Sequence, residues 1–265
     1  MTVYRTITVD TKDAVARLTL DRPEVRNAMN PEMIGEITSA FAEFNRNDEI
    51  RAVVLRGNGG VFCAGGDLNW MKDVLGQTEQ EVQEDSRHLL NMYRSINESP
   101  KLVIAALEGA VIAGGLGLVA CSDVVIAEEK TKFCVSEVKI GLAPGIIAAY
   151  MLPRIGPGWM RYLSKTAILF DAETARTAGL VHELADDATD LERRIANHVD
   201  LVLGASPDAI ERTARLIEEL GYATSEEMLT TGLIYNAKAR LSPEAQEGIS
   251  SFLEKRKPGW SPEAD

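Results

Sequence analysis

Two segments of the sequence share a design that could stabilise a developing negative charge. In each, a short apolar run leads into a glycine-rich turn: residues 52–55 precede Cys63-Ala-Gly-Gly-Asp67, and residues 102–107 precede Ala113-Gly-Gly115. A turn of this kind before a helix points free backbone N–H groups and the positive end of a helix dipole at one spot. Glycine lets a ligand approach the backbone closely. Either turn alone is typical of an ordinary tight strand-to-helix connection, so the inference needs both.

Residues 115–120 also match the dinucleotide-binding pattern G-x-G-x-x-G/A. Only a few residues separate Gly117 from Ser122-Asp123, where the next strand is expected, whereas a Rossmann crossover needs a helix of about ten residues. This spacing argues against a nicotinamide or flavin oxidoreductase. The sequence also lacks the nucleophile elbow, the phosphate-binding loop and the zinc-protease helix that would indicate other enzyme classes.

The segments that would position the two glycine-rich turns alternate between strand and helix. The expected elements are strands over 6–10 and 14–20 forming a hairpin, a helix from Pro31 with Asn30 as its N-cap, a strand over 51–56, a helix over 81–97 and a strand over 101–107. This alternation is typical of an α/β fold with a largely parallel sheet.

After about residue 171 the pattern becomes helical. The expected helices cover 173–178, 190–203, 207–220, 225–240 and 243–255. Each has an apolar face of its own, so these helices must pack on the core or on a neighbouring subunit. The sequence therefore predicts a core domain over residues 1–200 and a C-terminal helical region over residues 201–265.

Composition and charge exclude several classes of protein. The 265 residues are 45% hydrophobic and 26% charged, which is the balance of a globular domain. The formal net charge of −12 repels polyanions and argues against a nucleic-acid partner. Cys63, Cys121 and Cys134 show no Cys-x-x-Cys spacing, and His88, His182 and His198 have no carboxylate or cysteine at ligand spacing, so we expect neither a disulfide framework nor a metal site.

Neither end of the sequence nor its interior indicates a membrane protein. The opening MTVYRTITVD lacks a basic region followed by an apolar core, so no secretory signal is indicated and a cytoplasmic protein is expected. The most apolar stretch, residues 102–127, is interrupted by Glu108 and Asp123. The piece between them is too short to cross a hydrocarbon core of about 30 Å.

Four motifs, in the right order, resemble those of the enoyl-CoA hydratase/isomerase (crotonase) family. They are Leu18-Thr-Leu-Asp-Arg-Pro-Glu-Val-Arg-Asn-Ala-Met29, Phe62-Cys-Ala-Gly-Gly-Asp-Leu68, Gly109-Ala-Val-Ile-Ala-Gly-Gly115 and Ser136-Glu-Val-Lys-Ile-Gly-Leu-Ala-Pro144. The resemblance covers residues 17 to about 260. It implies a crotonase-like ββα spiral core with a C-terminal helical trimerisation region, an acyl-CoA substrate with no cofactor besides its own coenzyme A, and a homotrimer or a dimer of trimers.

The resemblance also implies roles for individual residues. It assigns the oxyanion-hole N–H groups to Gly66 and Gly114 and the acid/base to Glu137. Two such donors aimed at an enolate oxygen supply roughly 3 kcal/mol each. The family's hydratases commonly use a second glutamate, which here falls on Gly117. The residues expected to contact coenzyme A are Arg26, Ala28, Ala64, Gly65, Gly66, Asp67, Leu68, Phe252 and Lys255.

A single glutamate leaves two reactions open, because hydration and Δ3-Δ2 isomerisation pass through the same enolate. Residues 67–72 and 136–142 resemble the 3-methylglutaconyl-CoA and carboxygeranoyl-CoA hydratases, which favours hydration of a branched or carboxylated enoyl-CoA. Arg154 or Lys72 is then expected near the distal carboxylate. Isomerisation, which needs only one base, is the alternative. A non-catalytic scaffold is a third possibility, against which the intact glycine-rich turns argue. The acyl group is expected to lie against 70–85 and 145–151.

Overall fold

The structure is a computed structural model that describes residues 3–73, 77–221, 243–244, 247, 251 and 254–260. The chain divides into two compact units, Met1–Ile195 and Ala196–Asp265. The boundary falls inside helix α7 (Ala188–Leu203), and each unit is described by itself.

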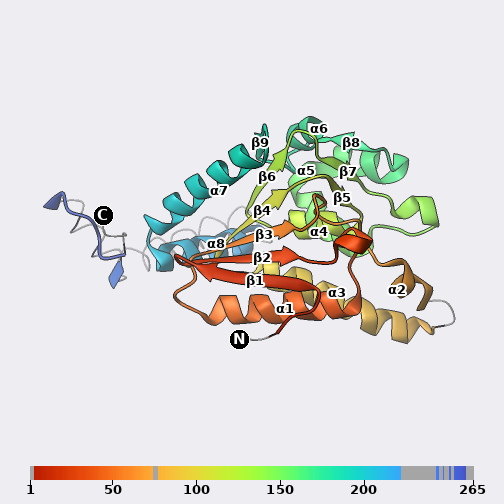
Figure 1. Cartoon of the computed structure of the whole chain (residues 1–265), viewed down its shortest axis with the longest axis horizontal. Helices are drawn as coiled ribbons and strands as arrows, with labels where there is room; N and C mark the ends of the chain where they lie inside the picture. Colours follow the sequence, from red (N-terminus) through yellow and green to blue (C-terminus); the bar gives the residue numbers. More distant parts are fainter. Residues whose placement is uncertain are drawn as a thin grey trace. The chain divides into compact units, whose positions relative to one another are not determined.

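The first unit is built on a six-stranded sheet with the order β1-β2-β3-β4-β6-β9 (Figure 1). Its strands are β1 (Ile7–Lys12), β2 (Val15–Leu20), β3 (Ala52–Gly57), β4 (Leu102–Leu107), β6 (Val124–Glu128) and β9 (Glu183–Ala185). The strands β1 and β2 form an antiparallel hairpin, and all later neighbours pair in parallel. The predicted α/β fold with an opening hairpin and a largely parallel sheet is confirmed.

A second, smaller sheet contains the strand that precedes the second glycine-rich turn. It has the order β5-β7-β8, from β5 (Ala110–Ile112), β7 (Lys132–Cys134) and β8 (Phe170–Asp171). The strands β5 and β7 pair in parallel, whereas β7 and β8 are antiparallel. Because β5 and β7 run in the same direction, the segments that follow them leave the sheet at the same edge.

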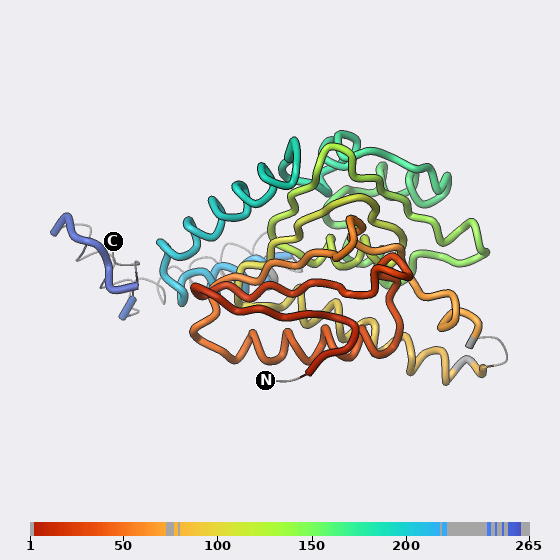
Figure 2. Tube along the Cα trace, viewed as in Figure 1, coloured from red at the N-terminus to blue at the C-terminus, as the bar shows by residue number. Residues whose placement is uncertain are grey.

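Helices cover the sheets. They are α1 (Pro31–Arg46), α2 (Leu68–Asp73), α3 (Glu79–Asn97), α4 (Gly114–Ala120), α5 (Gly145–Thr166), α6 (Ala172–Thr177), α7 and α8 (Pro207–Gly221), with short 3-10 helices η1 (Pro23–Val25) and η2 (Glu137–Ile140). The helices α1 and α3 pack against each other below the sheet in this view, as the trace also shows (Figure 2). The Asn30 side chain accepts the Met33 N–H at 2.9 Å, which confirms the predicted N-cap.

The core follows from the apolar pattern of these elements. One face of α1 is buried through Met33, Ile34, Ile37, Ala40, Phe41 and Phe44. Strands β3 and β4 are almost entirely buried, with Val53, Val54 and Leu55 at 0% exposure, as expected for strands covered on both faces. Each such fully buried side chain stabilises the fold by about 1.5–3 kcal/mol relative to an exposed one.

The C-terminal half differs from the prediction in one strand. Residues after 171 were expected to be helical, yet β9 covers Glu183–Ala185 and completes the main sheet beside β6. Three residues are too few to show an alternating pattern, so the sequence carried no signal for this strand. The predicted helix over 225–240 lies outside the described residues, and the one over 243–255 is described only in part.

Helix α5 contains a kink. Gly156 has a φ of 69° and a ψ of 166°, and Pro153 and Pro157 flank it. Each proline lacks the N–H that would bond one turn back, so the backbone ladder is interrupted on both sides of Gly156.

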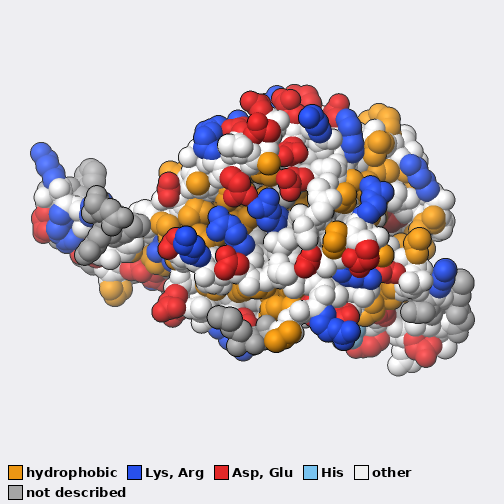
Figure 3. Space-filling view, in the orientation of Figure 1, with side chains coloured by type: hydrophobic (Ala, Val, Ile, Leu, Met, Phe, Trp, Pro, Cys, Tyr) orange, Lys and Arg blue, Asp and Glu red, His pale blue; other side chains and the backbone are white. Residues whose placement is uncertain are grey.

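The surface is predominantly acidic. Acidic side chains gather along the upper edge of the view in Figure 3, over α6 and β9, in keeping with the net charge of −12. Among the described residues, every helix is too short or too polar to span a bilayer.

Candidate active site

The two glycine-rich turns lie side by side. We name Cys63–Asp67 the first glycine loop and Ala113–Gly117 the second glycine loop. Cys63 forms a parallel bridge with Val111, and its carbonyl accepts the Ile112 N–H at 2.9 Å. Gly66 and Gly114 each lie three residues beyond this bridge, so they leave the paired segments at the same edge.

Each glycine loop presents a free amide. Within the described part of the chain, neither the Gly66 N–H nor the Gly114 N–H donates a hydrogen bond, and Gly114 begins α4, where first-turn amides have no intrahelical acceptor. The residue before each donor has a positive φ: 96° at Gly65 and 46° at Ala113. Alanine rarely adopts such a conformation, so the second glycine loop stores backbone strain at the residue that orients its donor.

Met29 joins the two glycine loops. Its N–H donates to the Gly65 carbonyl at 2.7 Å, and its carbonyl accepts the Asp67 N–H at 2.8 Å, so residues 65–67 are paired with it on both sides of Gly66. A Cβ placed on Gly114 would lie only 2.5 Å from the Met29 Cε. Met29 is therefore buried between the loops, although its sequence motif indicated no such role.

Glu137 follows the strand next to the second glycine loop. Strand β7 pairs with β5, the Ala113 N–H donates to the Cys134 carbonyl at 2.9 Å, and Glu137 opens η2 three residues later. Its Oε2 is buried and has no hydrogen-bond partner among the described residues. Burial raises the pKa of Glu137 above its ordinary value, an effect that its own backbone N–H partly offsets. A half-buried carboxylate with a raised pKa and one buried oxygen that has no partner among the described residues is suited to proton transfer.

The side chain of Tyr93, from α3, packs against the second glycine loop. Its hydroxyl donates to the Gly114 carbonyl at 2.7 Å, and its side chain is fully buried. Burial raises the pKa of Tyr93 well above the ordinary value, and the negative charge of nearby Glu137 raises it further, so the phenol stays protonated. An aromatic residue at helical spacing is usually a core residue, so no pattern in the sequence distinguished Tyr93.

An ion pair supports the first glycine loop. Arg22 Nη2 lies 2.8 Å from Asp67 Oδ2, and Arg22 Nη1 donates to the Ala28 carbonyl at 2.7 Å. Asp67 also accepts the Asn69 N–H at 2.8 Å. The Asn69 N–H has the largest effect and lowers the pKa of Asp67, burial opposes it, and the hydrogen bond and charge of Arg22 lower the pKa further. The Asp67 carboxylate, expected at the coenzyme A site, is thus turned toward the protein.

Asn27 is a further residue that the sequence did not single out. It is completely buried, and its amide donates to the Asn58 carbonyl at 2.8 Å and the Val61 carbonyl at 2.6 Å. Its side-chain oxygen accepts the Arg22 N–H at 2.9 Å. With these three bonds Asn27 ties the segment before α1 to the segment before the first glycine loop.

The remaining residues expected at coenzyme A fall into two groups. The Ala64 N–H donates to the Arg26 carbonyl at 3.0 Å, which brings the segment containing Arg26 and Ala28 beside the first glycine loop. Arg26 and Leu68 are exposed there, Leu68 at 74%. Lys255 is exposed in the second unit, and Phe252 lies outside the described residues. Their expected contact with coenzyme A stays a prediction.

Arg154 was expected near the distal carboxylate of a substrate, but its guanidinium is held inside the fold. Its Nη2 donates to the Ser122 carbonyl just beyond the end of α4, and Asp123 lies close enough for its charge to act on Arg154. Asp123 is itself bonded to the Val103 N–H at 2.8 Å. Arg154 thus stabilises the C-terminal end of α4. Lys72, the other expected cation, is exposed on α2.

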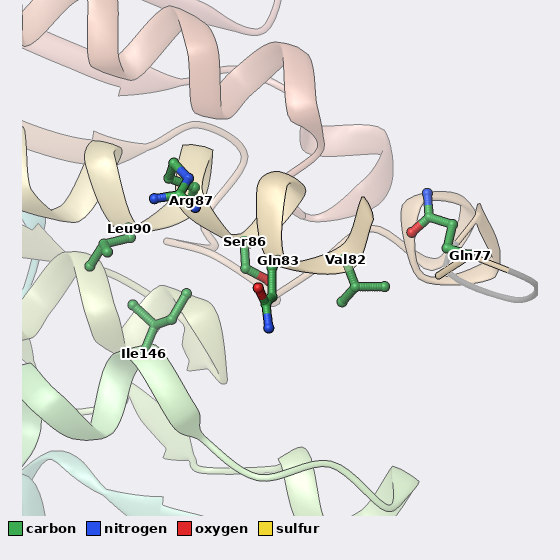
Figure 4. Close-up of a pocket in the computed structure, with 7 residues that line it drawn as sticks. All are labelled: Gln77, Val82, Gln83, Ser86, Arg87, Leu90 and Ile146. Carbon is green, nitrogen blue, oxygen red and sulfur yellow. The ribbon is translucent and has the colours of Figure 1, made fainter. Parts of the chain in front are cut away.

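A cavity of about 520 Å³ lies between α3 and the start of α5 (Figure 4). Its lining consists of Gln77, Val82, Gln83, Ser86, Arg87, Leu90 and Ile146. This set overlaps the ranges expected to hold the acyl group. Tyr93 is one turn beyond Leu90 and Tyr150 one turn beyond Ile146, and the two tyrosine rings are 6.0 Å apart. The two helices that form the cavity therefore meet at Tyr93, beside the second glycine loop.

Other chemistries find no support in the described residues. Among them, no group of three or more His, Cys, Asp or Glu side chains could hold a metal ion. The three cysteines are free and buried, and burial raises the pKa of the Cys63 thiol to about 12, so it stays protonated. The match to the dinucleotide pattern falls on α4, which is only seven residues long.

Solved structures define the class of fold. The chain superposes on an enoyl-CoA hydratase from Shewanella pealeana with a TM-score of 0.93 and 33% identity, covering 97% of this chain and 96% of that one. It also superposes on Pseudomonas aeruginosa AtuE with a TM-score of 0.93 and 34% identity, covering 97% and 100% of the two chains. The fold is therefore the crotonase fold.

The sequence comparisons then give the family. The profile of the enoyl-CoA hydratase/isomerase family matches residues 10–263. A 1,2-epoxyphenylacetyl-CoA isomerase from Escherichia coli is 31% identical over 93% of this chain and 95% of its own length. A crotonyl-CoA hydratase from Syntrophomonas wolfei is 30% identical over 96% and 97% of the two chains. This chain belongs to the enoyl-CoA hydratase/isomerase family, whose members act on acyl-CoA thioesters.

Proposed function

We propose that this protein hydrates an enoyl-CoA thioester with a branched or carboxylated acyl group, of the 3-methylglutaconyl-CoA type. One observation carries the proposal: two amides, at Gly66 and Gly114, and one buried carboxylate oxygen, at Glu137, have no partner among the described residues and follow three adjoining parallel segments. Two donors and one base are what a thioester enolate needs.

Glu137 can perform both proton transfers of the hydration. The Gly66 and Gly114 amides donate to the thioester oxygen, which becomes negative as the water oxygen bonds to C3. Glu137 Oε2 takes the proton that this water releases. The resulting carboxylic acid then returns the proton to C2, the enolate collapses to the thioester, and Glu137 is again ionised. One water is consumed, and no second carboxylate is required.

The cavity beside α3 suits the acyl group of such a substrate. Val82, Leu90 and Ile146 provide apolar surface, and Arg87 adds a positive charge at the same cavity. Among the described residues Arg87 pairs with Glu84 alone, at 3.1 Å, and both side chains are 63% exposed, so this pair is weak. Arg87 is thus available to a distal carboxylate, a role for which Arg154, bonded to the Ser122 carbonyl, is not suited.

One observation also favours isomerisation as a second candidate. With Gly117 in place of the first glutamate, the site has one assigned carboxylate, and moving a proton between C2 and C4 requires only one. Here Glu137 would take the proton from C2 of a 3-enoyl-CoA and deliver it to C4.

Self-association and coenzyme A binding complete the proposal. A homotrimer or a dimer of trimers is supported by large apolar side chains exposed in and after η2 and along and after α5, namely Val138, Ile140, Leu142, Leu152, Ile168 and Leu169. The segments around Arg26 and Ala64 would hold coenzyme A beside the first glycine loop. Light scattering at micromolar concentration that gives a monomer would contradict the oligomer.

The reaction is tested by following product mass. The purified protein is incubated with 3-methylglutaconyl-CoA and, separately, with a 3-enoyl-CoA. Gain of one water on the first supports hydration. A 2-enoyl-CoA at unchanged mass from the second, without water gain on either, would establish the isomerase instead. Absence of turnover on both would overturn the proposal in favour of a scaffold.

Variants test the residues. Glu137→Gln is expected to lower kcat by about 10²-fold or more while binding of the CoA ester is retained. Glu173→Gln removes an exposed carboxylate on α6 and is the matched control.

Arg87→Gln should raise KM about tenfold for a carboxylated enoyl-CoA but not for crotonyl-CoA. Equal effects on both esters would remove Arg87 from acyl recognition.

A further inference from the structure

Tyr93 occupies the space that a side chain at position 117 would need. A Cβ placed on Gly117 would lie 2.5 Å from the Tyr93 Cζ, 2.6 Å from its Cε1 and 2.8 Å from its Oη. Real Cβ atoms are not found so close to another heavy atom, so even alanine at position 117 would require the phenol to move. Position 117 is also where the family's hydratases commonly carry their first glutamate.

The Tyr93 ring has no easy way to move aside. Its side chain is 0% exposed, and its hydroxyl is bonded to the Gly114 carbonyl at 2.7 Å. The Tyr150 ring packs against it with ring centroids 6.0 Å apart. Displacing Tyr93 would therefore break a buried hydrogen bond and disturb a packed core at the same time.

The hydroxyl does not replace the missing carboxylate as a proton donor. Its single proton is already directed at the Gly114 carbonyl, and the phenol stays neutral in these surroundings. Its bond acts instead on the residue whose N–H is the proposed oxyanion donor. Fixing the Gly114 carbonyl restrains the first turn of α4 and thereby the direction of that N–H.

We infer that Tyr93 is a reaction-determining positioning residue: its ring excludes a second carboxylate at position 117, and its hydroxyl holds the oxyanion donor at Gly114 in place. The site then works with Glu137 as its one carboxylate because the fold leaves no room for another. The inference rests on the proposed function for the role of Glu137 and Gly114. The steric exclusion at Gly117 does not depend on that function.

Thermal unfolding tests the exclusion without reference to activity. Gly117→Glu is expected to lower Tm by about 5 °C or more, because the new side chain overpacks a filled core. Tyr93→Ala lowers Tm by leaving a cavity. In the double variant Tyr93→Ala/Gly117→Glu the carboxylate side chain enters the vacated space, so its Tm should exceed the value expected if the two losses added. Strictly additive losses, or a Gly117→Glu variant as stable as the parent, would overturn the exclusion.

Kinetics test the positioning role. Tyr93→Phe keeps the ring and removes only the bond to Gly114, so kcat should fall about tenfold with KM and the acid limb of the pH profile unchanged. Tyr162→Phe, which removes the hydroxyl of an exposed tyrosine on α5, is the control. An unchanged kcat in Tyr93→Phe would overturn the positioning role. If the parent protein turns over no enoyl-CoA, the proposed function fails while the thermal test of exclusion still stands.

Discussion

The two glycine loops present the same chemical group but are held in place by different forces. In the first glycine loop, a Cβ on Gly66 would lie closer than 3 Å only to the Met71 methyl group, at 2.9 Å, with the Trp70 ring in ordinary contact at 3.8 Å, and the Arg22–Asp67 ion pair supports the loop. In the second, Gly115 and Gly117 are buried, and a Cβ on Gly115 would lie 2.9 Å from the Cys63 Cβ. One loop is thus oriented by polar contacts and the other by close packing.

This difference separates two kinds of sensitivity. A loop held by close packing cannot accommodate a larger side chain, but its stability does not depend on the ionisation of neighbouring groups. A loop fixed by an ion pair and hydrogen bonds tolerates small changes of volume but depends on the protonation of its carboxylate. Six experiments on the two loops and on Glu137 follow from this difference, beginning with the largest expected effect.

The largest effect is expected from adding one methyl group at each donor position. Gly114→Ala places a Cβ 2.5 Å from the buried Met29 Cε, so the loop must shift and kcat should fall by about 10²-fold or more. Gly66→Ala meets only the Met71 side-chain end, which can move, so a fall of about tenfold or less is expected. Both N–H groups remain present in the variants. Equal losses of kcat would show that the loops do not differ in rigidity.

Breaking the ion pair should destabilise the protein while leaving the second glycine loop unaffected. Asp67→Asn leaves the Arg22 charge with 17% side-chain exposure and no carboxylate partner, so the free energy of unfolding should fall by about 1–3 kcal/mol. Glu173→Gln breaks an exposed pair on α6 and should change it by less than about 0.5 kcal/mol. Urea unfolding at neutral pH measures both variants.

The pH dependence of this difference has a defined sign. The folded-state pKa of Asp67 is lowered, so its contribution is present above the unfolded pKa and is lost as the pH falls through the lower folded pKa. Parent and Asp67→Asn should therefore converge in stability below about pH 3.8. A difference that persists unchanged in acid would contradict a role for the ionised carboxylate.

A smaller effect is expected in the pH profile of activity, which distinguishes a change in loop geometry from a change in the pKa of Glu137. Because burial raises its pKa, the acid limb of kcat/KM should lie above 4.5, the ordinary pKa of glutamate. Gly66→Ala should lower the rate without moving this limb, since the first glycine loop does not contact Glu137 in the described hydrogen bonds. A limb at or below 4.5 would contradict the buried carboxylate.

The raised pKa of Glu137 also predicts a stability effect. Its folded-state pKa exceeds the unfolded value, so its contribution is fully present below the unfolded pKa and is lost as the pH rises through the folded one. At pH 7 Glu137→Gln should therefore be at least as stable as the parent, with a Tm raised by about 1–3 °C. A lower Tm for this variant would show that the ionised carboxylate stabilises the fold.

The smallest effect is expected where the two loops differ in the residue before the donor. Ala113→Gly removes strain of about 1–3 kcal/mol but adds unfolded-state entropy worth about 0.4–1 kcal/mol, so stability should change little or rise slightly. The reverse exchange, Gly65→Ala, adds strain at a φ of 96° and a contact 3.2 Å from the Ala113 Cβ, and should destabilise. Thermal unfolding of both variants measures the asymmetry.

The sequence predicted those parts of the fold that rest on local patterns. The β1–β2 hairpin, α1 with its Asn30 cap, and the strands β3 and β4 follow from apolar periodicity and capping chemistry. It missed β9, since three residues carry no readable period. Helix α5 and its kink were likewise not predicted, because Pro153 and Pro157 interrupt the helical pattern of this segment and φ at Gly156 depends on the tertiary fold.

For the candidate site, the sequence indicated the glycine loops and Glu137 but not the residues that hold them in position. The glycine loops were found from strand-turn patterns, and Glu137 from a resemblance. The contacts of Met29, Asn27 and Tyr93 join segments far apart in the chain, so no local pattern could reveal them. Arg154 was expected near the substrate, but its guanidinium bonds to the Ser122 carbonyl inside the fold. The sequence shows that a side chain is charged but not the direction in which it points.

The kink at Gly156 separates α5 into two halves whose backbone hydrogen bonds are not continuous. Its first half contains Ile146, which lines the cavity, and Tyr150, which packs on Tyr93. Its second half, beyond Gly156, anchors Met160 and Leu163 in the core. Because the hydrogen-bond ladder is interrupted at Pro153 and Pro157, a tilt of the first half is not transmitted rigidly to the second. In the proposed function, the wall of the cavity could therefore adjust to acyl groups of different width while the rest of the helix keeps its place.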